Sequence, residues 1–165
     1  MAQIYISLGS NINREYHVKQ GLISLATEFD VPFTTLQLSS LFECEAVGFK
    51  GAVFYNMVIG IECQHSVEQV ATILRKIEFN HGRDHNATKF SPRTLDLDLL
   101  LYDNLITNQP AQLPRDEITK NAFVLWPLSQ LAPNLSHPIL HTNYQNLWLH
   151  YNKNSQKIHI VENCW

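Results

Sequence analysis

The chain has 165 residues, 45% of them hydrophobic, so one compact domain can bury a sizeable core. The formal net charge of −3 gives no general attraction for nucleic acid, and no apolar run has the length of a membrane span or the character of a signal peptide. Three scattered cysteines without a CxxC spacing argue against a disulfide framework and a zinc site. We therefore expect a cytoplasmic protein that binds neither nucleic acid nor membranes.

The spacing of apolar residues predicts alternating strands and helices. Period-two alternation indicates strands, whereas spacings of three and four indicate helices. In chain order we expect a strand at 4–8, a helix at 15–29, strands at 34–42 and Phe54–Cys63, a helix from 67 to about 81, a strand at 94–102, a short edge piece at 105–106, helices at 123–131 and 144–151, and a strand at 157–161. Ser66 and Gln69 form a capping box for the second helix, while Pro127 and Pro133 should limit the third. This order predicts the α+β class: a ferredoxin-like split βαβ fold, with helices packed on an antiparallel sheet in a single domain covering residues 1–165.

Three polar segments fall between these elements. Residues 43–53 hold two glycines without a helical period, and residues 83–92 are mostly polar, so both should be long loops. Residues 107–121 carry two prolines and should be irregular. Long loops in compact domains are often functional, so the first two are natural places to look for a site.

Two carboxylates interrupt the leucine-rich strand at 94–102. Alternation places Asp96 and Asp98 on one face, roughly 7 Å apart at two strand rises, opposite Leu95, Leu97 and Leu99. Carboxylates among leucines lose hydration unless something compensates, and Mg²⁺ is commonly held by one or two carboxylates plus substrate phosphates. The pair therefore fits a magnesium site, although a half-exposed strand whose aspartates face water is equally compatible with the pattern.

Charged residues that precede this strand favour a phosphate ligand. Arg83 and Arg93 bracket the polar loop before the strand, and guanidinium groups clamp phosphate oxygens bidentately. Glu78 lies near the end of the second helix, where a carboxylate opposes the helix dipole and so needs a partner or a ligand. A surface glutamate beside Lys76 is the simpler alternative for Glu78.

Aromatic and amide side chains indicate a second kind of ligand. Phe54 and Asn56 share one face of the third strand, and Phe123 could supply an opposing ring. An aromatic ring stacks on a flat heterocycle while an amide reads its donor and acceptor edge. Aromatic residues in such positions are also common as plain core.

Together these residues resemble the 6-hydroxymethyl-7,8-dihydropterin pyrophosphokinase family. The segment KFSPRTLDLDLL at 89–100 is similar to the long and specific signature of that family. Further similarity covers Gly9-Ser-Asn11, Phe54-Tyr-Asn56, Glu78 with Gly82-Arg83, and the segment from Phe123 to Pro133. The region after about His137 matches poorly.

The resemblance implies a role for each matching residue. Asp96 and Asp98 would hold two Mg²⁺ ions between the phosphates of ATP and the pterin hydroxymethyl oxygen. Phe54 and Phe123 would sandwich the pterin, Asn56 would bond its edge, and backbone groups around Cys44 to Val47 would contact it. For ATP the implied residues are Glu78, Arg83, Arg93 and Arg115, and the catalytic set is Arg83, Arg93, Asp96 and Asp98.

The chain also departs from the family pattern. Where members usually carry Pro-His-Tyr or Pro-His-Pro, it has Pro114-Arg115-Asp116; Asn121 stands where arginine is frequent, His85 where some members have arginine, and Phe90 where tryptophan is common. Arg115 can replace the histidine as a cationic donor to phosphate. Asp116 would be unfavourable near a triphosphate unless it is paired or turned away.

The activity implied is transfer of pyrophosphate from ATP to the hydroxymethyl group of 6-hydroxymethyl-7,8-dihydropterin, with release of AMP, in folate biosynthesis. We expect a monomeric transferase that uses ATP as co-substrate. One alternative is a same-fold paralogue that binds pterin or nucleotide with weak or lost transfer activity. A second is a ferredoxin-like nucleic-acid module, which the net charge and the aspartate pair speak against.

Overall fold

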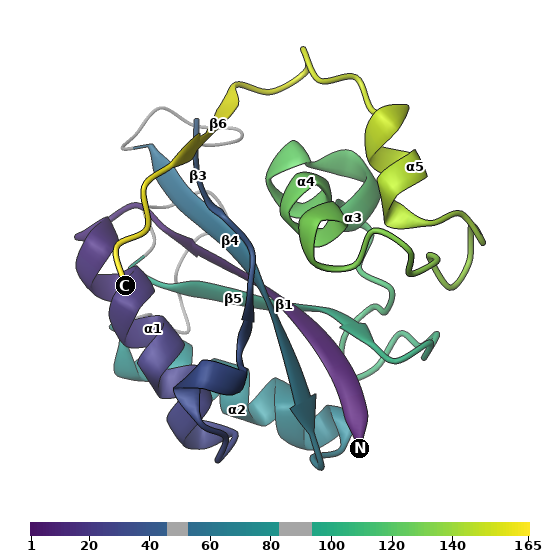
Figure 1. The fold of residues 1–165 in the computed structure, drawn as a ribbon. Coiled ribbons are helices and arrows are strands. Elements are labelled where there is room, and N and C mark those ends of the chain that lie inside the picture. Colours follow the sequence, from purple (N-terminus) through teal and green to yellow (C-terminus); the bar gives the residue numbers. More distant parts are fainter. Residues whose placement is uncertain (46–52, 83–93) are drawn as a thin grey trace.

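The structure is a computed structural model that describes residues 1–45, 53–82 and 94–165. Its centre is an antiparallel sheet in the order β5-β1-β4-β3-β6, with β2 also paired to β4 (Figure 1). The strands are β1 Ala2–Ser10, β2 Gln37–Leu38, β3 Leu41–Cys44, β4 Phe54–Cys63, β5 Asp96–Tyr102 and β6 Ile158–Val161. The helices are α1 Arg14–Glu28, α2 Val67–Asn80, α3 Glu117–Lys120, α4 Ala122–Leu131 and α5 Tyr144–Leu149, with a 3-10 turn at Phe33–Thr35. The α+β class and the antiparallel sheet predicted from the sequence are confirmed.

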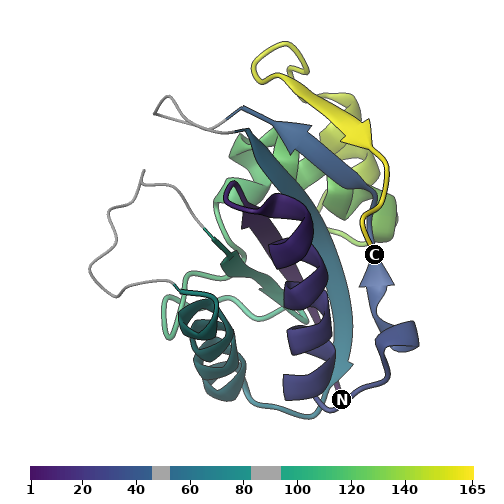
Figure 2. The same cartoon turned by 90° about the vertical axis from the view of Figure 1, so that its left-hand side faces the viewer.

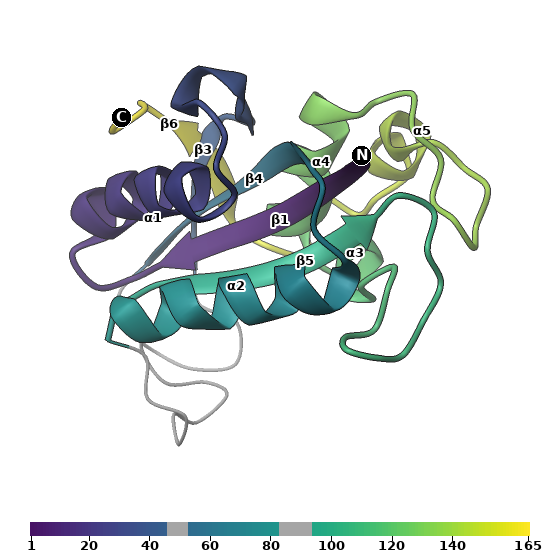
Figure 3. The ribbon, with the colours of Figure 1, turned by 90° about the horizontal axis from the view of Figure 1, so that it is seen from below.

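Helices cover both faces of the sheet. Figures 2 and 3 show α1 and α2 on one face and α3, α4 and α5 on the other. Each face has its own apolar core, because strand residues alternate between them: Ile4, Ile6 and Leu8 pack with α1 and α2, whereas Tyr5 and Val58 pack with α4. The structure has no helix in its described ranges that is long and apolar enough to cross a membrane.

Local sequence signals set the boundaries of α2 and β4 as expected. Ser66 Oγ accepts a hydrogen bond from the Gln69 N–H at 3.2 Å, and the Gln69 Oε1 accepts one from the Ser66 N–H at 2.8 Å, so the capping box forms. Gly82 follows the helix end with a φ of +91°, a conformation that favours glycine. The β4 bounds match the predicted strand.

A bulge in β5 modifies the predicted alternation. Leu99 lies opposite Ile6 and Leu101 opposite Tyr5, so Leu100 is an extra residue without a partner position in β1. Leu100 and Leu101 therefore both pack in the core beneath α4. Before the bulge, Leu95, Leu97 and Leu99 face α1 and α2 as predicted, which leaves Asp96 and Asp98 on the face of α3 and α4.

Four predictions about the elements differ from the structure. The single strand at 34–42 is replaced by a 3-10 turn and two short strands, and the edge piece at 105–106 does not form. Pro127 lies inside α4 rather than limiting it, while Pro133 does follow the helix end. A short helix, α3, occupies part of the segment expected to be irregular. The last strand, β6, pairs with β3 and so extends the sheet of its own chain.

Candidate active site

The register of the sheet brings the two groups of predicted site residues into one row. Gly9 of β1 lies opposite Asn56 of β4 on one side and opposite Asp96 of β5 on the other. Residues directly opposite one another share a face, and neighbouring strands are about 4.8 Å apart, so Asn56 and Asp96 are separated by about 10 Å across a residue without a side chain. The amide expected to read a heterocycle and the carboxylate expected to bind metal therefore lie on either side of Gly9, on one face of the sheet.

Asn56 is held in place by Cys44. The Asn56 side-chain amide donates to the Cys44 Sγ at 2.6 Å, and both residues are buried. Burial raises the pKa of the Cys44 thiol to about 12, an effect that the hydrogen bond from Asn56 only partly opposes. Cys44 is therefore a neutral thiol that orients the amide, and the Asn56 Oδ1 lies over Gly9, where a Cβ would approach it to 2.8 Å.

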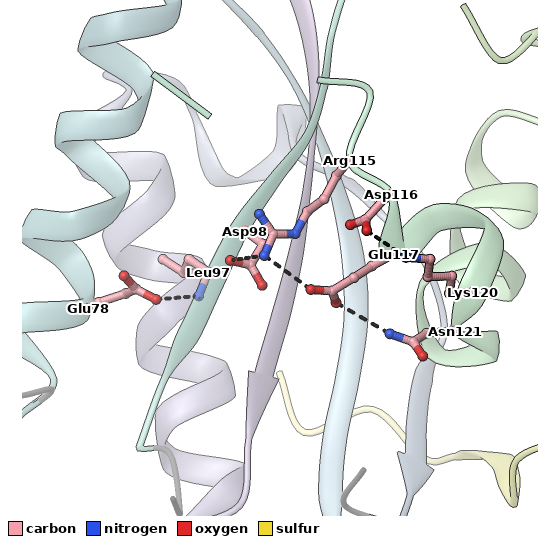
Figure 4. Close-up of polar contacts among 8 residues, drawn as sticks. All are labelled: Glu78, Leu97, Asp98, Arg115, Asp116, Glu117, Lys120 and Asn121. Atoms are coloured by element: carbon pink, nitrogen blue, oxygen red, sulfur yellow. Dashed lines mark hydrogen bonds and ion pairs between the residues drawn. The ribbon is translucent and has the colours of Figure 1, made fainter. Parts of the chain in front are cut away.

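Glu78 supports the strand that carries the aspartates. Its side chain is only 8% exposed, and its Oε2 accepts a hydrogen bond of 2.9 Å from the Leu97 N–H, between Asp96 and Asp98 (Figure 4). Since β5 is the edge strand of the sheet in the described ranges, no further strand there accepts a hydrogen bond from this N–H. The partner that the sequence required for Glu78 is thus the backbone of β5, while Lys76 pairs instead with Glu28.

Arg115 reaches the aspartate pair from the segment before α3. Its backbone N–H donates to the carbonyl of the bulged Leu100 at 3.0 Å, which fixes the residue beside β5. Its guanidinium lies 3.3 Å from the Asp98 Oδ1 and 3.1 Å from the Glu117 Oε1 (Figure 4). Burial opposes the charged form, but Asp98 and Glu117 outweigh it, so the pKa of Arg115 is raised and the side chain is cationic.

One buried donor of Arg115 is still available. Its Nε–H is buried and has no hydrogen-bond partner in the described ranges 1–45, 53–82 and 94–165. A buried donor without an acceptor is costly, so a ligand oxygen at this position would be stabilised.

Two further departures from the family pattern, Asp116 and Asn121, also find partners. Asp116 accepts a hydrogen bond of 2.8 Å from Lys120, which lowers the pKa of its carboxyl group and keeps its charge engaged. Asn121 donates to Glu117 at 3.4 Å and accepts from Gln156 at 3.0 Å. Glu117 and Gln156 were not identified from the sequence, because nothing in their local pattern distinguishes them from surface residues.

The remaining predicted site residues divide into two groups. Phe54 begins β4, and Phe123 lies in the first turn of α4, partly buried against the core beneath that helix. Val47, Arg83 and Arg93 lie outside the described residues, as do His85 and Phe90. Among the described residues, no group of three or more His, Cys, Asp or Glu side chains could hold a metal ion, so Asp96 and Asp98 would need further oxygen ligands from phosphate or water.

A known family matches the part of the chain that builds this site. The model of 7,8-dihydro-6-hydroxymethylpterin-pyrophosphokinase matches residues 5–133. This range includes every site residue named from the sequence, from Cys44 to Phe123. It ends before α5 and β6.

Individual relatives agree with the family match. The chain is 34% identical over 132 residues to the 2-amino-4-hydroxy-6-hydroxymethyldihydropteridine pyrophosphokinase of Bacillus subtilis, covering 78% of this chain and 77% of that protein. It is 29% identical over 142 residues to the protein of the same name from Aquifex aeolicus, covering 84% and 86%. A folate synthesis bifunctional protein of Chlamydia caviae is 31% identical over 137 residues, covering 79% of this chain but only 30% of that protein.

Solved structures show the same fold. The HPPK-DHPS of Plasmodium falciparum superposes with a TM-score of 0.64 at 11% sequence identity, covering 90% of this chain and 43% of that chain. At this identity the likeness concerns the arrangement of helices and strands.

Proposed function

This chain belongs to the 7,8-dihydro-6-hydroxymethylpterin-pyrophosphokinase family, and we propose that it transfers pyrophosphate from ATP to the hydroxymethyl group of 6-hydroxymethyl-7,8-dihydropterin, releasing AMP. The observation that carries the proposal is the row Asn56, Gly9 and Asp96, which sets a heterocycle-reading amide and a carboxylate on one face of the sheet. Relatives of similar length carry the name pyrophosphokinase, so a paralogue that only binds pterin is not favoured. The reaction is a step of folate synthesis.

The acceptor would bind beside Asn56. Asn56, oriented by Cys44, would present its amide to the edge of the pterin, and the absent side chain of Gly9 leaves room for that amide, whose Oδ1 a Cβ would approach to 2.8 Å. Phe54 at the start of β4 and Phe123 at the start of α4 would stack on the two faces of the ring. Backbone groups from Cys44 to Val47 would complete this subsite.

Asp96 and Asp98 would hold two Mg²⁺ ions. The residues fit this role, because two carboxylates share one face and Asp98 already attracts the guanidinium of Arg115 at 3.3 Å. When bound, the ions would neutralise charge on the phosphates of ATP and help to align them with the acceptor. The remaining ligands would be phosphate oxygens and water, consistent with the lack of a third side-chain ligand in the described part of the chain.

Arg115, Arg83 and Arg93 would bind the phosphates. The buried Nε–H of Arg115, which lacks a partner in the described ranges, is a donor that a phosphate oxygen would satisfy. The Nη2 of Arg115 that lies 3.3 Å from Asp98 also lies 3.1 Å from Glu117, so the two carboxylates share the guanidinium. Glu78 contributes to the ATP site indirectly in this proposal, by fixing the backbone between the two aspartates.

The bond changes follow from this placement. The hydroxymethyl oxygen attacks the β-phosphorus of ATP and loses its proton to solvent, a new oxygen–phosphorus bond forms, the bond between the β-phosphorus and the bridging oxygen to the α-phosphate breaks, and AMP leaves with that oxygen. No side chain is needed to form a covalent intermediate. The contribution of the protein is to position the two substrates and to supply arginine cations where charge develops on the phosphates.

We further propose a monomeric, cytoplasmic enzyme. All three cysteines are free thiols, which suits a reducing compartment. The edge of β3 is covered by β6 of the same chain, so this edge is not available for pairing with a second copy.

The test is release of AMP from MgATP in the presence of 6-hydroxymethyl-7,8-dihydropterin. We expect release that requires the dihydropterin and is abolished by chelation of divalent cations. AMP released at the same rate without the dihydropterin would mean hydrolysis, and release of ADP would mean transfer of a single phosphate. Either result would refute the proposed reaction.

A further inference from the structure

Residues 144–161, here called the tail, contact the junction between α3 and α4. The tail lies beyond the family match at 5–133 and runs from α5 to β6 (Figure 1). Its Tyr151 hydroxyl donates to the Lys120 carbonyl at 2.7 Å, and Gln156 bonds to both Asn121 and Ala122. The contacts thus gather at the point where α3 ends and α4 begins.

Stacked aromatic rings fix the tail on α4. The Trp148 ring is stacked on Trp126 of α4, with centroids 5.1 Å apart and planes at 13°. Tyr151 stacks on Trp148 in turn at 5.6 Å, and Trp126 packs against Phe42 of β3 at 4.8 Å. The position of the tail is therefore determined by packing and does not depend on Gln156 alone.

Gln156 supplies the N-terminal cap that α4 lacks. The first N–H groups of a helix have no partner within it, and the residue before α4, Asn121, makes no capping bond with its side chain. The Gln156 Oε1 accepts from the Ala122 N–H at 2.7 Å, and its amide donates to the Asn121 Oδ1 at 3.0 Å. One side chain from the tail thus fixes the first turn of α4, which carries Phe123.

The same side chain is linked to the aspartate pair. Asn121 donates to Glu117, Glu117 accepts from Arg115, and Arg115 lies 3.3 Å from Asp98 (Figure 4). Each bond leaves the next side chain in a defined orientation, because Glu117 uses one oxygen for Asn121 and the other for Arg115. Gln156 therefore connects to both expected substrate subsites, one through the α4 backbone and one through side chains.

We propose that Gln156 is a positioning residue for both substrates, acting on Phe123 through the Ala122 N–H and on Arg115 through Asn121 and Glu117. The inference rests on the proposed function only for the identity of the substrates. It assigns to the tail a task in the site, although the tail lies outside the range that the family model matches.

The decisive comparison is between Gln156→Ala and Gln130→Ala. Gln130 also joins α4 to another segment with two hydrogen bonds, accepting from the Ser40 N–H at 2.9 Å and donating to the Ser40 Oγ at 3.1 Å, but it lies near the other end of the helix. Gln130→Ala therefore removes a similar pair of hydrogen bonds at a position distant from Phe123. Dihydropterin affinity would be measured by calorimetry with an unreactive MgATP analogue, and KM and kcat by AMP release.

We expect Gln156→Ala to raise the dissociation constant for the dihydropterin and the KM for ATP about fivefold to tenfold, with a smaller change in kcat. Gln130→Ala should change the dissociation constant for the dihydropterin and the KM for ATP by less than about twofold, at a similar loss of thermal stability. Gln156→Glu keeps an oxygen for the Ala122 N–H and should restore dihydropterin affinity. Equal effects of Gln156→Ala and Gln130→Ala, or no rescue by Gln156→Glu, would overturn the proposal.

Amide hydrogen exchange separates this proposal from the proposed function. Gln156→Ala should speed exchange at Ala122 by about fivefold or more in the substrate-free protein, whereas Gln130→Ala should not. This readout needs no substrate. Unchanged exchange at Ala122 would refute the role of Gln156 even in an active enzyme, whereas accelerated exchange in a protein that releases no AMP would refute only the proposed reaction.

Discussion

Gly9→Ala is the sharpest test of how the sheet presents Asn56. A Cβ at this position would lie 2.8 Å from the Asn56 Oδ1 and 3.6 Å from the Phe54 Cδ1. Asn56 cannot easily turn away, because it is buried and its amide is bonded to Cys44. The added methyl group should therefore displace the amide that we propose reads the pterin.

The expected cost follows from these contacts. Overpacking costs about 1–3 kcal/mol, and loss of the bond from Asn56 to Cys44 costs about 1 kcal/mol. Replacing glycine within a strand returns roughly 0.5–1 kcal/mol. The net loss is about 2 kcal/mol, which for a domain of this size lowers Tm by about 4–8 °C.

Kinetics separate the local effect from the loss of stability. Gly9→Ala should raise KM for the dihydropterin about tenfold, while KM for ATP changes by less than about twofold. Gly60→Ala is the matched control. Gly60 lies on the face of β4 that also carries Asn56, and an added Cβ there would meet the Gln37 Oε1 at 2.6 Å, away from the site. The control should lose stability and keep both KM values. A Gly9→Ala variant with unchanged KM for the dihydropterin would show that Asn56 does not read this substrate.

Three further predictions concern the carboxylates and one histidine. Asp96→Ala or Asp98→Ala should abolish AMP release while the folded structure persists by circular dichroism; near-normal turnover in either would exclude the two-metal assignment. Glu78→Ala should cost about 1–3 kcal/mol in urea unfolding because the β5 N–H loses its acceptor, and Glu78→Gln should cost less; equal stability of Glu78→Ala and the parent would contradict this. The pKa of His137 is lowered by burial and then by the charge of His141, so its contribution to stability is present above pH 6.5 and lost as pH falls below that value. His137→Asn should flatten that part of the stability profile, and an unchanged slope would disprove the assignment.

Much of the sheet was predictable because local signals and burial agreed. The apolar alternation of Phe54–Cys63 placed Asn56 on the same face as Val58, and the structure confirms this. The strand at 94–102 likewise placed Leu97 and Asp98 on opposite faces. In both strands the period of two is imposed by burial against helices, so the sequence carries the pattern directly.

The broken strand at 34–42 shows where propensity fails. The Ser39 hydroxyl accepts from the Val58 N–H at 2.9 Å and donates to the Ser40 carbonyl at 2.8 Å. The Ser39 N–H still donates to the Val58 carbonyl at 3.1 Å, but the Val58 N–H bonds to a side chain instead of a backbone carbonyl, and the ladder is interrupted between β2 and β3. A composition rich in β-forming residues does not indicate where a side chain will take a strand N–H in this way.

The contact between Arg115 and Asp98 could not be predicted from spacing. It depends on the bulge that frees the Leu100 carbonyl for the Arg115 N–H, and a bulge adds one residue without changing composition. Glu117 and Gln156 were missed for a related reason: each acquires its role only after α3, α4 and the tail have packed together. Tertiary contacts of this kind have no local signature.

The bulge and Glu78 together have a consequence for how the protein behaves in a crowded solution. β5 ends the sheet, and an exposed strand edge is a template for pairing with other chains. Here an N–H on β5 is taken by Glu78 and the carbonyl of Leu100 by Arg115, so two of the groups that an incoming strand would seek are already engaged. The contacts that hold β5 in place thus also cover part of its edge, and substitutions at Glu78, whose side chain makes one of them, should be judged by solubility as well as by turnover.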